Sequence, residues 1–133
     1  MIFGGDGNDQ IIGGKGRDMI YGGLGKDILT GSEGADTFAW LSIEEIGTSL
    51  ETADRIRYFS NDEQDQLNLK SIDANEFVSG NQAFLFHYDN TFTRPGQLKI
   101  EYLELPKETH VFFNTDWDTA AEAILVFNNI VNL

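Results

Sequence analysis

The sequence predicts an all-β protein in which stacked parallel strands are followed by strands that pair in an antiparallel way. Two observations carry this prediction: a nine-residue unit that occurs four times between Gly4 and Ala39, and a series of short β-prone segments beyond it. The chain has 133 residues, which suits one continuous domain. We expect residues 1–39 to form a repeat region and residues 40–133 to continue it.

The four units are equal in length and carry the same residue types at the same places. They read GGDGNDQII, GGKGRDMIY, GGLGKDILT and GSEGADTFA, without insertion. Glycine permits a tight turn that exposes carbonyl oxygens. The last three residues are β-prone, and only the eighth is regularly large and apolar, which predicts a short strand with its middle side chain turned inward. Two units make one coil, so strands 18 residues apart stack in parallel.

The aspartates at the sixth places are the main candidate metal ligands. Stacking puts Asp9 above Asp27 on one edge of the coils, and Asp18 above Asp36 on the other. At about 5 Å and an effective dielectric near 20, each carboxylate pair repels by roughly 3 kcal/mol. Calcium accepts carboxylate and turn-carbonyl oxygens, so Ca²⁺ is the expected cofactor. The other predicted ligands lie in the same turns: Asp6, Asn8, Gly5, Gly7, Gly14, Gly16, Gly23, Gly25 and Gly34.

Two simpler interpretations explain the repeat region less well. A flexible glycine-rich linker has no use for large apolar residues in phase with the glycines. A solvated acidic face explains single aspartates, but it does not explain four of them locked to the glycine frame.

Composition and motifs limit the classes of function. The formal net charge of -13 repels phosphate backbones, which disfavours nucleic acid as a partner. No apolar run approaches the roughly 20 residues of a membrane helix, so no membrane insertion is expected. The absence of Cys excludes zinc-thiolate sites and thiol nucleophiles. HExxH, GxSxG and phosphate-binding glycine motifs are missing, and His87 and His110 stand alone, so no catalytic residue is predicted.

Past Ala39 the nine-residue period ends. The stretch from Trp40 to Glu51 is expected to be a loop with one short helix. Short strands are predicted at residues 55–59, 66–69, 83–88, 97–103 and 110–113, separated by polar turns, with antiparallel pairing. Composition alone leaves residues 120–127 open between helix and strand.

Two acidic regions outside the repeats are candidates for further metal ligands. Asp54 and Asp65 could finish the open end of the aspartate array, although a solvated turn explains Asp65 as well. Asp116 and Asp118 lie in a segment, residues 114–122, with the alternate spacing of a calcium loop. Counted from Asn114, the sixth place is Thr119 and the twelfth is Leu125, which departs from the EF-hand pattern, so a polar turn is the alternative.

The four units resemble the RTX repeats of proteins exported by Gram-negative type I secretion systems. Later segments resemble, in order, the C-terminal domain of serralysin metalloproteases: GADTF at 34–38, DRIRYF at 54–59, DQLNL at 65–69, QAF at 82–84, FTRPGQL at 92–98 and NTDWDTAAEAIL at 114–125. Tyr58 and Asn68 stand where that family tends to have acidic residues. The resemblance covers essentially the whole chain. It implies a calcium-binding β-roll continued by an antiparallel β-sandwich-like half, and it favours a strand at 120–127.

The resemblance also implies a function: a noncatalytic module of a secreted, extracellular bacterial protein that calcium folds after export. The implied partners are calcium ions, the type I secretion machinery and an upstream domain, such as a metalloprotease or another hydrolase, in the parent chain. The uncharged tail, Ile124 to Leu133, resembles the export signal of such proteins. The alternative is a polysaccharide- or surface-binding module of a secreted epimerase or adhesin, which would need basic residues gathered on one face.

The start of the chain falls within the repeat frame. Projecting the frame backwards puts Ile2 at the inward apolar place of an earlier unit, whose glycines and aspartate are missing. We therefore expect Met1 to mark a cut within a longer array. An open strand edge at this end predicts self-association there.

Overall fold

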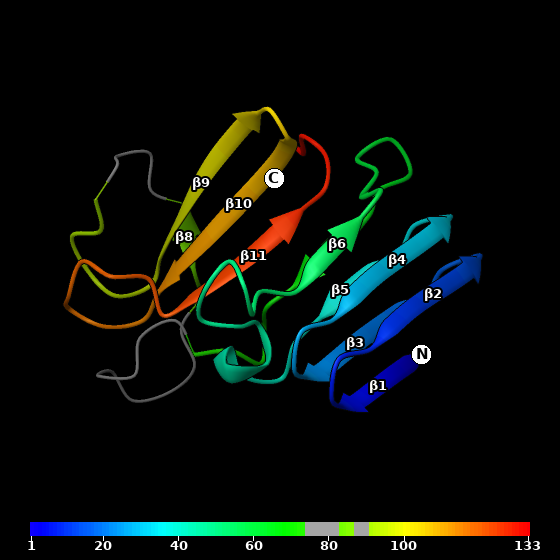
Figure 1. Ribbon diagram of the computed structural model, residues 1–133, viewed down its shortest axis with the longest axis horizontal. Coiled ribbons are helices and arrows are strands. Elements are labelled where there is room, and N and C mark those ends of the chain that lie inside the picture. The colour runs from blue at the N-terminus through cyan, green and yellow to red at the C-terminus, as the bar shows by residue number, and fades with distance from the viewer. Residues whose placement is uncertain (74–82, 87–90) are drawn as a thin grey trace.

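The computed structural model describes residues 1–73, 83–86 and 91–133. Its strands are β1 (Ile2–Asp6), β2 (Gln10–Lys15), β3 (Met19–Leu24), β4 (Ile28–Glu33), β5 (Thr37–Ala39), β6 (Arg55–Arg57), β7 (Gln66–Asn68), β8 (Leu85–Phe86), β9 (Gln97–Glu104), β10 (Lys107–Asn114) and β11 (Ala123–Phe127). They form a four-stranded sheet, in the order β1-β3-β5-β7, and a seven-stranded sheet, in the order β2-β4-β6-β11-β10-β9-β8 (Figure 1). The predicted all-β fold class is confirmed.

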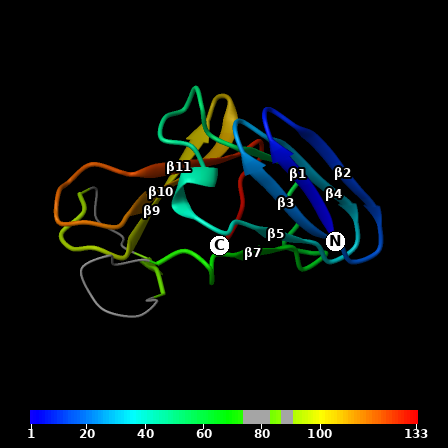
Figure 2. The same cartoon turned by 90° about the horizontal axis from the view of Figure 1, so that it is seen from below.

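The repeat region is a two-layered parallel roll. Strands of alternate units pair with a register of 18 residues, so that Ile2 lies beside Ile20 in β1 and β3, and Ile11 beside Leu29 in β2 and β4. Figure 2 shows these two layers, with β1, β3, β5 and β7 in one and β2 and β4 in the other. The predicted stacking is confirmed, and Ile2 takes the place of an eighth residue.

The roll extends beyond its four repeats. Strand β6 pairs in parallel with β4, where Leu29 faces Ile56, and β7 pairs in parallel with β5, where Phe38 faces Leu67. A loop precedes β6 and another precedes β7. The loop before β6 contains the 3-10 helix η1 (Ile43–Glu45), as the composition of that stretch predicted.

The core lies between the two layers and continues under the second half of the chain. The side chains at the eighth places of the last three units, Ile20, Leu29 and Phe38, are fully buried. Phe59 packs edge-on against Phe127, with ring centroids 5.3 Å apart, and so joins the roll to the strands that follow. Burial of this kind stabilises the fold by roughly 1.5–3 kcal/mol for each large apolar side chain.

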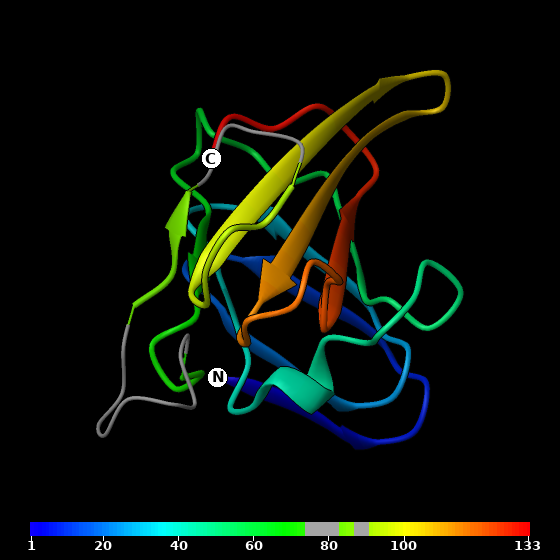
Figure 3. The same cartoon turned by 90° about the vertical axis from the view of Figure 1, so that its left-hand side faces the viewer.

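The second half adds antiparallel strands to one edge of the roll. Strands β9, β10 and β11 pair in antiparallel order, and β11 lies parallel to β6, where Phe127 faces Ile56. Figure 3 shows the β9–β10 hairpin, in yellow and orange, in front of the blue roll strands. The strand predicted by the resemblance at 120–127 is present as β11. Of the predicted strand 83–88, the last two residues, His87 and Tyr88, lie outside the described part of the chain.

The pairing differs in one respect from the predicted antiparallel continuation, since β6, β7 and β8 pair in parallel with their neighbours. In the part of the chain that the structure describes, no helix is long and apolar enough to cross a lipid bilayer.

Candidate metal centre

The turns of the roll depend on glycine for two different reasons. The glycines at the second and fourth places of the units have positive φ, as at Gly14 (109°) and Gly16 (108°), a conformation that L side chains rarely adopt. Ser32 replaces glycine in the fourth unit and still takes a φ of 86°. The first glycine is needed for space instead: a Cβ atom on Gly13 would lie 2.7 Å from Oδ2 of Asp18.

The aspartates at the sixth places form two columns, one along each edge of the roll. In each pair, the backbone N–H of the earlier residue donates to Oδ1 of the later one: Asp9 to Asp27, and Asp18 to Asp36, both at 2.8 Å. The structure therefore brings together the four aspartates that the sequence predicted, in the predicted pairs.

The second carboxylate oxygen of each of these four aspartates has no protein partner. Oδ2 of Asp9, Asp18, Asp27 and Asp36 is buried and makes no hydrogen bond. A buried, unpaired charged oxygen costs several kcal/mol, on the order of the penalty for a lost charged hydrogen bond. Four such atoms in two regular columns indicate that a cation, and not a protein donor, satisfies them.

The electrostatics of the two aspartate columns also favours a bound cation. Burial, together with the charge of Asp9, raises the pKa of Asp27. Burial also raises the pKa of Asp36, and the carboxylates of Asp65 and Asp18 add to the effect. Without a cation, the folded roll therefore disfavours the charged form of its own ligands.

Backbone carbonyl oxygens lie in the same turns. A Cβ atom added to Gly23 would meet the carbonyl oxygen of Gly5, and one added to Gly25 would meet that of Gly7. The glycines of one coil thus let the carbonyl groups of the coil before come close. Carboxylate and carbonyl oxygens together are the donor set that calcium prefers, and the residues present fit this ion.

The other predicted turn ligands are less clearly placed for a metal. Oδ1 of Asn8 accepts a hydrogen bond of 2.9 Å from the backbone N–H of Lys26, so its side chain ties two coils together. Asp6 is exposed at the end of β1. Their roles as ligands, and those of the turn glycines, stay predictions.

Asp54 and Asp65 extend the two columns, but their environment differs from that of the repeat aspartates. Oδ1 of Asp54 accepts the N–H of Asp27 at 2.8 Å, and Oδ1 of Asp65 accepts the N–H of Asp36 at 2.9 Å. Their Oδ2 atoms have protein donors, Nε1 of Trp40 at 2.8 Å and the N–H of Ser60 at 2.9 Å. Their use as metal ligands stays a prediction, and each already ends its column with a protein hydrogen bond.

A third group of acidic residues lies in the loop between β10 and β11. Carboxylate oxygens of Asp116, Asp118 and Glu122 lie within 4.8 Å of one another. Burial raises the pKa of Glu122, and the charges of Asp116 and Asp118 raise it further. The sequence indicated this segment, Glu122 included, and the fold brings the three carboxylates together.

His110 takes part in an ion-pair network. Its Nε2 lies 2.8 Å from Oε2 of Glu108, and Oε1 of Glu108 accepts a hydrogen bond of 2.9 Å from Arg55. The other histidine, His87, lies outside the described residues.

Comparison with known proteins identifies the repeats. Residues 3–38 match the family model of the RTX calcium-binding nonapeptide repeat, in four copies. This part of the chain is therefore an array of calcium-binding RTX repeats, and calcium is its metal. No curated protein matches the chain.

Solved structures that share this fold include two subunits of one enzyme. The AlgE6R2 subunit of the mannuronan C5-epimerase from Azotobacter vinelandii aligns with a TM-score of 0.59 and 23% identity over 97% of this chain and 84% of that subunit. The AlgE6R3 subunit of the same enzyme aligns with a TM-score of 0.55 and 18% identity over 92% of this chain and 71% of that subunit. At these identities the likeness shows the fold alone. The specific resemblance to serralysin C-terminal domains stays a prediction.

Proposed function

We propose that this chain is a noncatalytic calcium-binding module of a bacterial protein that leaves the cell through a type I exporter and folds outside. The observation that carries the proposal is the set of four buried, unpartnered Oδ2 atoms in the two aspartate columns. These residues have a low-energy folded arrangement only where a divalent cation is available. The chain can therefore respond to the difference in calcium concentration between cytosol and medium.

The physical basis is the charge of the columns. Free calcium in the cytosol is far below the roughly 0.1–1 mM that suits extracellular sites. There the stacked carboxylates repel one another and keep the repeat region open, which suits passage through a narrow exporter. Outside, calcium binds the folded roll and not the open chain, so it stabilises the fold by mass action. Through its paired strands the folded roll can then template a domain that precedes it in the parent chain.

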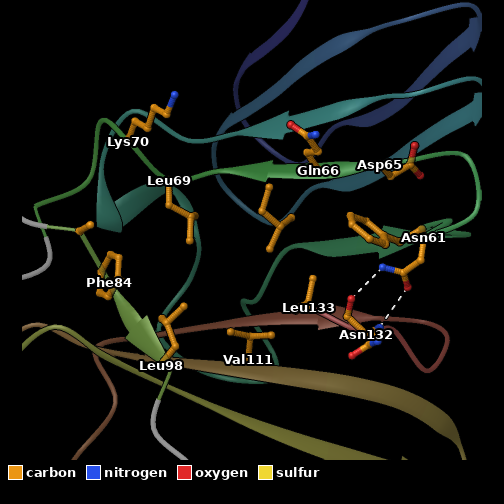
Figure 4. Close-up of a pocket in the computed structure, with 13 residues that line it drawn as sticks. Asn61, Asp65, Gln66, Leu69, Lys70, Phe84, Leu98, Val111, Asn132 and Leu133 are labelled. Atoms are coloured by element: carbon orange, nitrogen blue, oxygen red, sulfur yellow. Dashed lines mark hydrogen bonds between the residues drawn. The ribbon is translucent and has the colours of Figure 1, made fainter.

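The uncharged tail proposed as the export signal is built into the folded structure. Strand β11 lies between β6 and β10, and Val131 is almost fully buried. Asn61 holds the backbone of Asn132 with two hydrogen bonds, from its Nδ2 to the carbonyl oxygen at 2.8 Å and from the N–H to its Oδ1 at 3.0 Å (Figure 4). An exporter could therefore recognise this tail only before the chain folds, which agrees with folding after export.

Calcium titration followed by far-ultraviolet circular dichroism tests the folding part of the proposal. The chain should be largely unfolded in chelator and become β-rich with about 1 mM calcium. An unchanged spectrum and unchanged cooperative thermal unfolding after removal of calcium would rule out calcium-driven folding.

Export is tested separately, in a bacterium that carries a type I exporter. Deletion of residues 128–133 should retain the chain in the cytosol, whereas Asn61→Ala, which weakens the docking of the tail only in the folded state, should leave export intact. Export without the tail would show that the signal lies elsewhere.

A second candidate function is binding of an acidic polysaccharide, and the fold shared with subunits of a mannuronan C5-epimerase is what favours it. This function would need Arg55, Arg57, Arg94 and Lys99 to gather on one face. Two of these four residues already form ion pairs within the chain. Arg55 pairs with Glu108, and Lys99 pairs with Glu101 at 3.3 Å while its Nζ lies 4.5 Å from the centre of the Phe112 ring.

Arg57 and Arg94 complete the basic set, and the net charge of -13 opposes an anionic ligand. We therefore rank this function second. Isothermal titration with alginate oligomers in calcium distinguishes the two, because only the second candidate predicts heat of binding.

A further inference from the structure

The loop between β10 and β11 brings carboxylates together far from the aspartate columns. In Figure 1 this orange loop lies at the opposite side of the molecule from β1–β4. The oxygens of Asp116, Asp118 and Glu122 approach within 4.8 Å of one another. At that distance and an effective dielectric near 20, each pair of charges repels by roughly 3 kcal/mol. No ion pair to a basic side chain offsets this repulsion within the described residues.

Local hydrogen bonds hold the loop in this shape. Glu122 accepts the N–H of Thr115 at 2.6 Å, which brings the end of the loop back to its beginning. Oδ1 of Asp116 accepts the N–H of Asp118 at 2.8 Å, and Oδ1 of Asp118 accepts the N–H of Ala120 at 2.7 Å. Each carboxylate uses one oxygen in this way, so its other oxygen is available to a ligand.

Asn114 provides an independent indication of a ligand. Its side chain is fully buried, and its Nδ2 donates to the carbonyl oxygens of Arg94 at 2.8 Å and Asp116 at 3.0 Å. The amide group is thereby held against the start of the acidic loop. Its Oδ1 is buried there without any hydrogen-bond partner. A buried oxygen left unsatisfied costs about 1–3 kcal/mol, and coordination of a cation by this oxygen would remove that cost.

We propose that Oδ1 of Asn114 and the carboxylates of Asp116, Asp118 and Glu122 form a second calcium site, separate from the roll. The four residues occupy places one, three, five and nine of a segment with the alternate spacing of a calcium loop. Place seven is Ala120, which can offer only its backbone carbonyl group. The donors are all oxygens, and three are charged. Such a set suits calcium better than magnesium, which requires a stricter geometry.

This calcium site would be independent of the export function proposed above and of the calcium sites of the roll. By joining the end of β10 to the start of β11, a bound ion would fix the hairpin that carries the central strands of the larger sheet. The structure thus assigns calcium a role in the second half of the chain, where the nine-residue repeats are absent.

Trp117 lies between two of the proposed ligands and gives the site its own signal. It is exposed, whereas the other tryptophan, Trp40, is buried beside Asp54. We therefore suggest titrating the full chain with Tb³⁺, a luminescent substitute for calcium, while exciting tryptophan. Sensitised terbium emission should appear and should fall strongly in Trp117→Phe, which keeps all the ligands. The emission that remains in this variant reports Trp40 and the roll.

The decisive variant is Asp116→Asn with Asp118→Asn, since asparagine keeps the Oδ1 acceptors that shape the loop. Its matched control, Glu51→Gln with Glu104→Gln, removes the same charge from two exposed positions. Isothermal titration should find one calcium fewer per chain in the loop variant only, together with loss of the Trp117-sensitised emission. Calcium-induced folding of the roll, followed by circular dichroism, should persist and shows that the variant folds. An unchanged number of calcium ions in a folded loop variant would overturn the proposal, while leaving the roll sites untouched.

Discussion

Replacement of Asp27 by Asn separates the electrostatic role of this side chain from its role in packing. Asp27 is fully buried, its Oδ1 accepts the N–H of Asp9, and its Oδ2 has no protein partner. Asparagine has nearly the same shape and keeps the Oδ1 acceptor. What Asp27→Asn removes is one negative charge at a place where we predict a calcium ligand.

The loss of that charge should have opposite effects with and without calcium. Asp9 and Asp27 lie one strand spacing apart, about 5 Å, so at an effective dielectric near 20 the variant relieves roughly 3 kcal/mol of repulsion in the calcium-free fold. In the calcium-bound fold, the site loses an attraction of at least that size, because the ion carries two charges. Calcium affinity should therefore fall by about 100-fold or more.

The folded fraction by circular dichroism in chelator measures the first effect, and urea denaturation in about 1 mM calcium measures the second. In chelator, the folded fraction of Asp27→Asn should be larger than that of the natural protein, and in calcium its denaturation midpoint should be lower. Asp62→Asn, in an exposed turn, should change neither by much. Equal destabilisation of Asp27→Asn under both conditions would refute the reasoning, since it would mean that packing and not charge decides the effect.

Three further predictions concern the pH, the glycines and the end of one column. Burial raises the pKa of Asp54 to about 8 from 3.8. The calcium-free fold then holds a proton that the unfolded chain has lost, so the folded fraction in chelator, measured by circular dichroism, should fall as the pH rises from about 4 to about 8. Gly25→Ala should lower the melting temperature in calcium more than Gly7→Ala. Both glycines have positive φ, but only a Cβ on Gly25 meets a carbonyl oxygen. Equal decreases in melting temperature would count against close stacking of the coils. Trp40→Phe removes the donor to Oδ2 of Asp54 and should cost about 1–3 kcal/mol in urea denaturation with calcium; no loss would show that water replaces the indole.

The repeat region was predictable because each of its features is periodic. A fixed spacing of nine residues determines which strands stack, and hence that Asp9 meets Asp27 and Asp18 meets Asp36. The inward eighth place follows from the alternation of side chains along a strand. The period does not reveal that the first glycine of each unit makes room for the aspartate of the same unit, because this contact depends on how the turn closes.

The ends of the columns were only partly predictable. The spacing of Asp54 and Asp65 from the repeats is irregular, and loops of different length bring them into line with Asp27 and Asp36. Their protein donors, Trp40 and Ser60, have no signature in the sequence, since a hydrogen bond between distant segments depends on tertiary packing.

The second half of the chain shows where local patterns lose information. Alternating apolar residues predicted most of its strands, but strand patterns do not specify partners, and β6 and β7 join the roll in parallel. In the acidic loop, the spacing indicated Asp116 and Asp118. The buried, unpartnered oxygen of Asn114, which strengthens the case for a site there, is visible only in the folded structure.

The most direct test of the central claim is X-ray diffraction from crystals grown in calcium, with an anomalous difference map that locates the ions. The account predicts peaks along both edges of the roll, about 2.3–2.6 Å from Oδ2 of Asp9, Asp18, Asp27 and Asp36. Columns without such peaks, in which water molecules or protein donors satisfy these four oxygens, would contradict it.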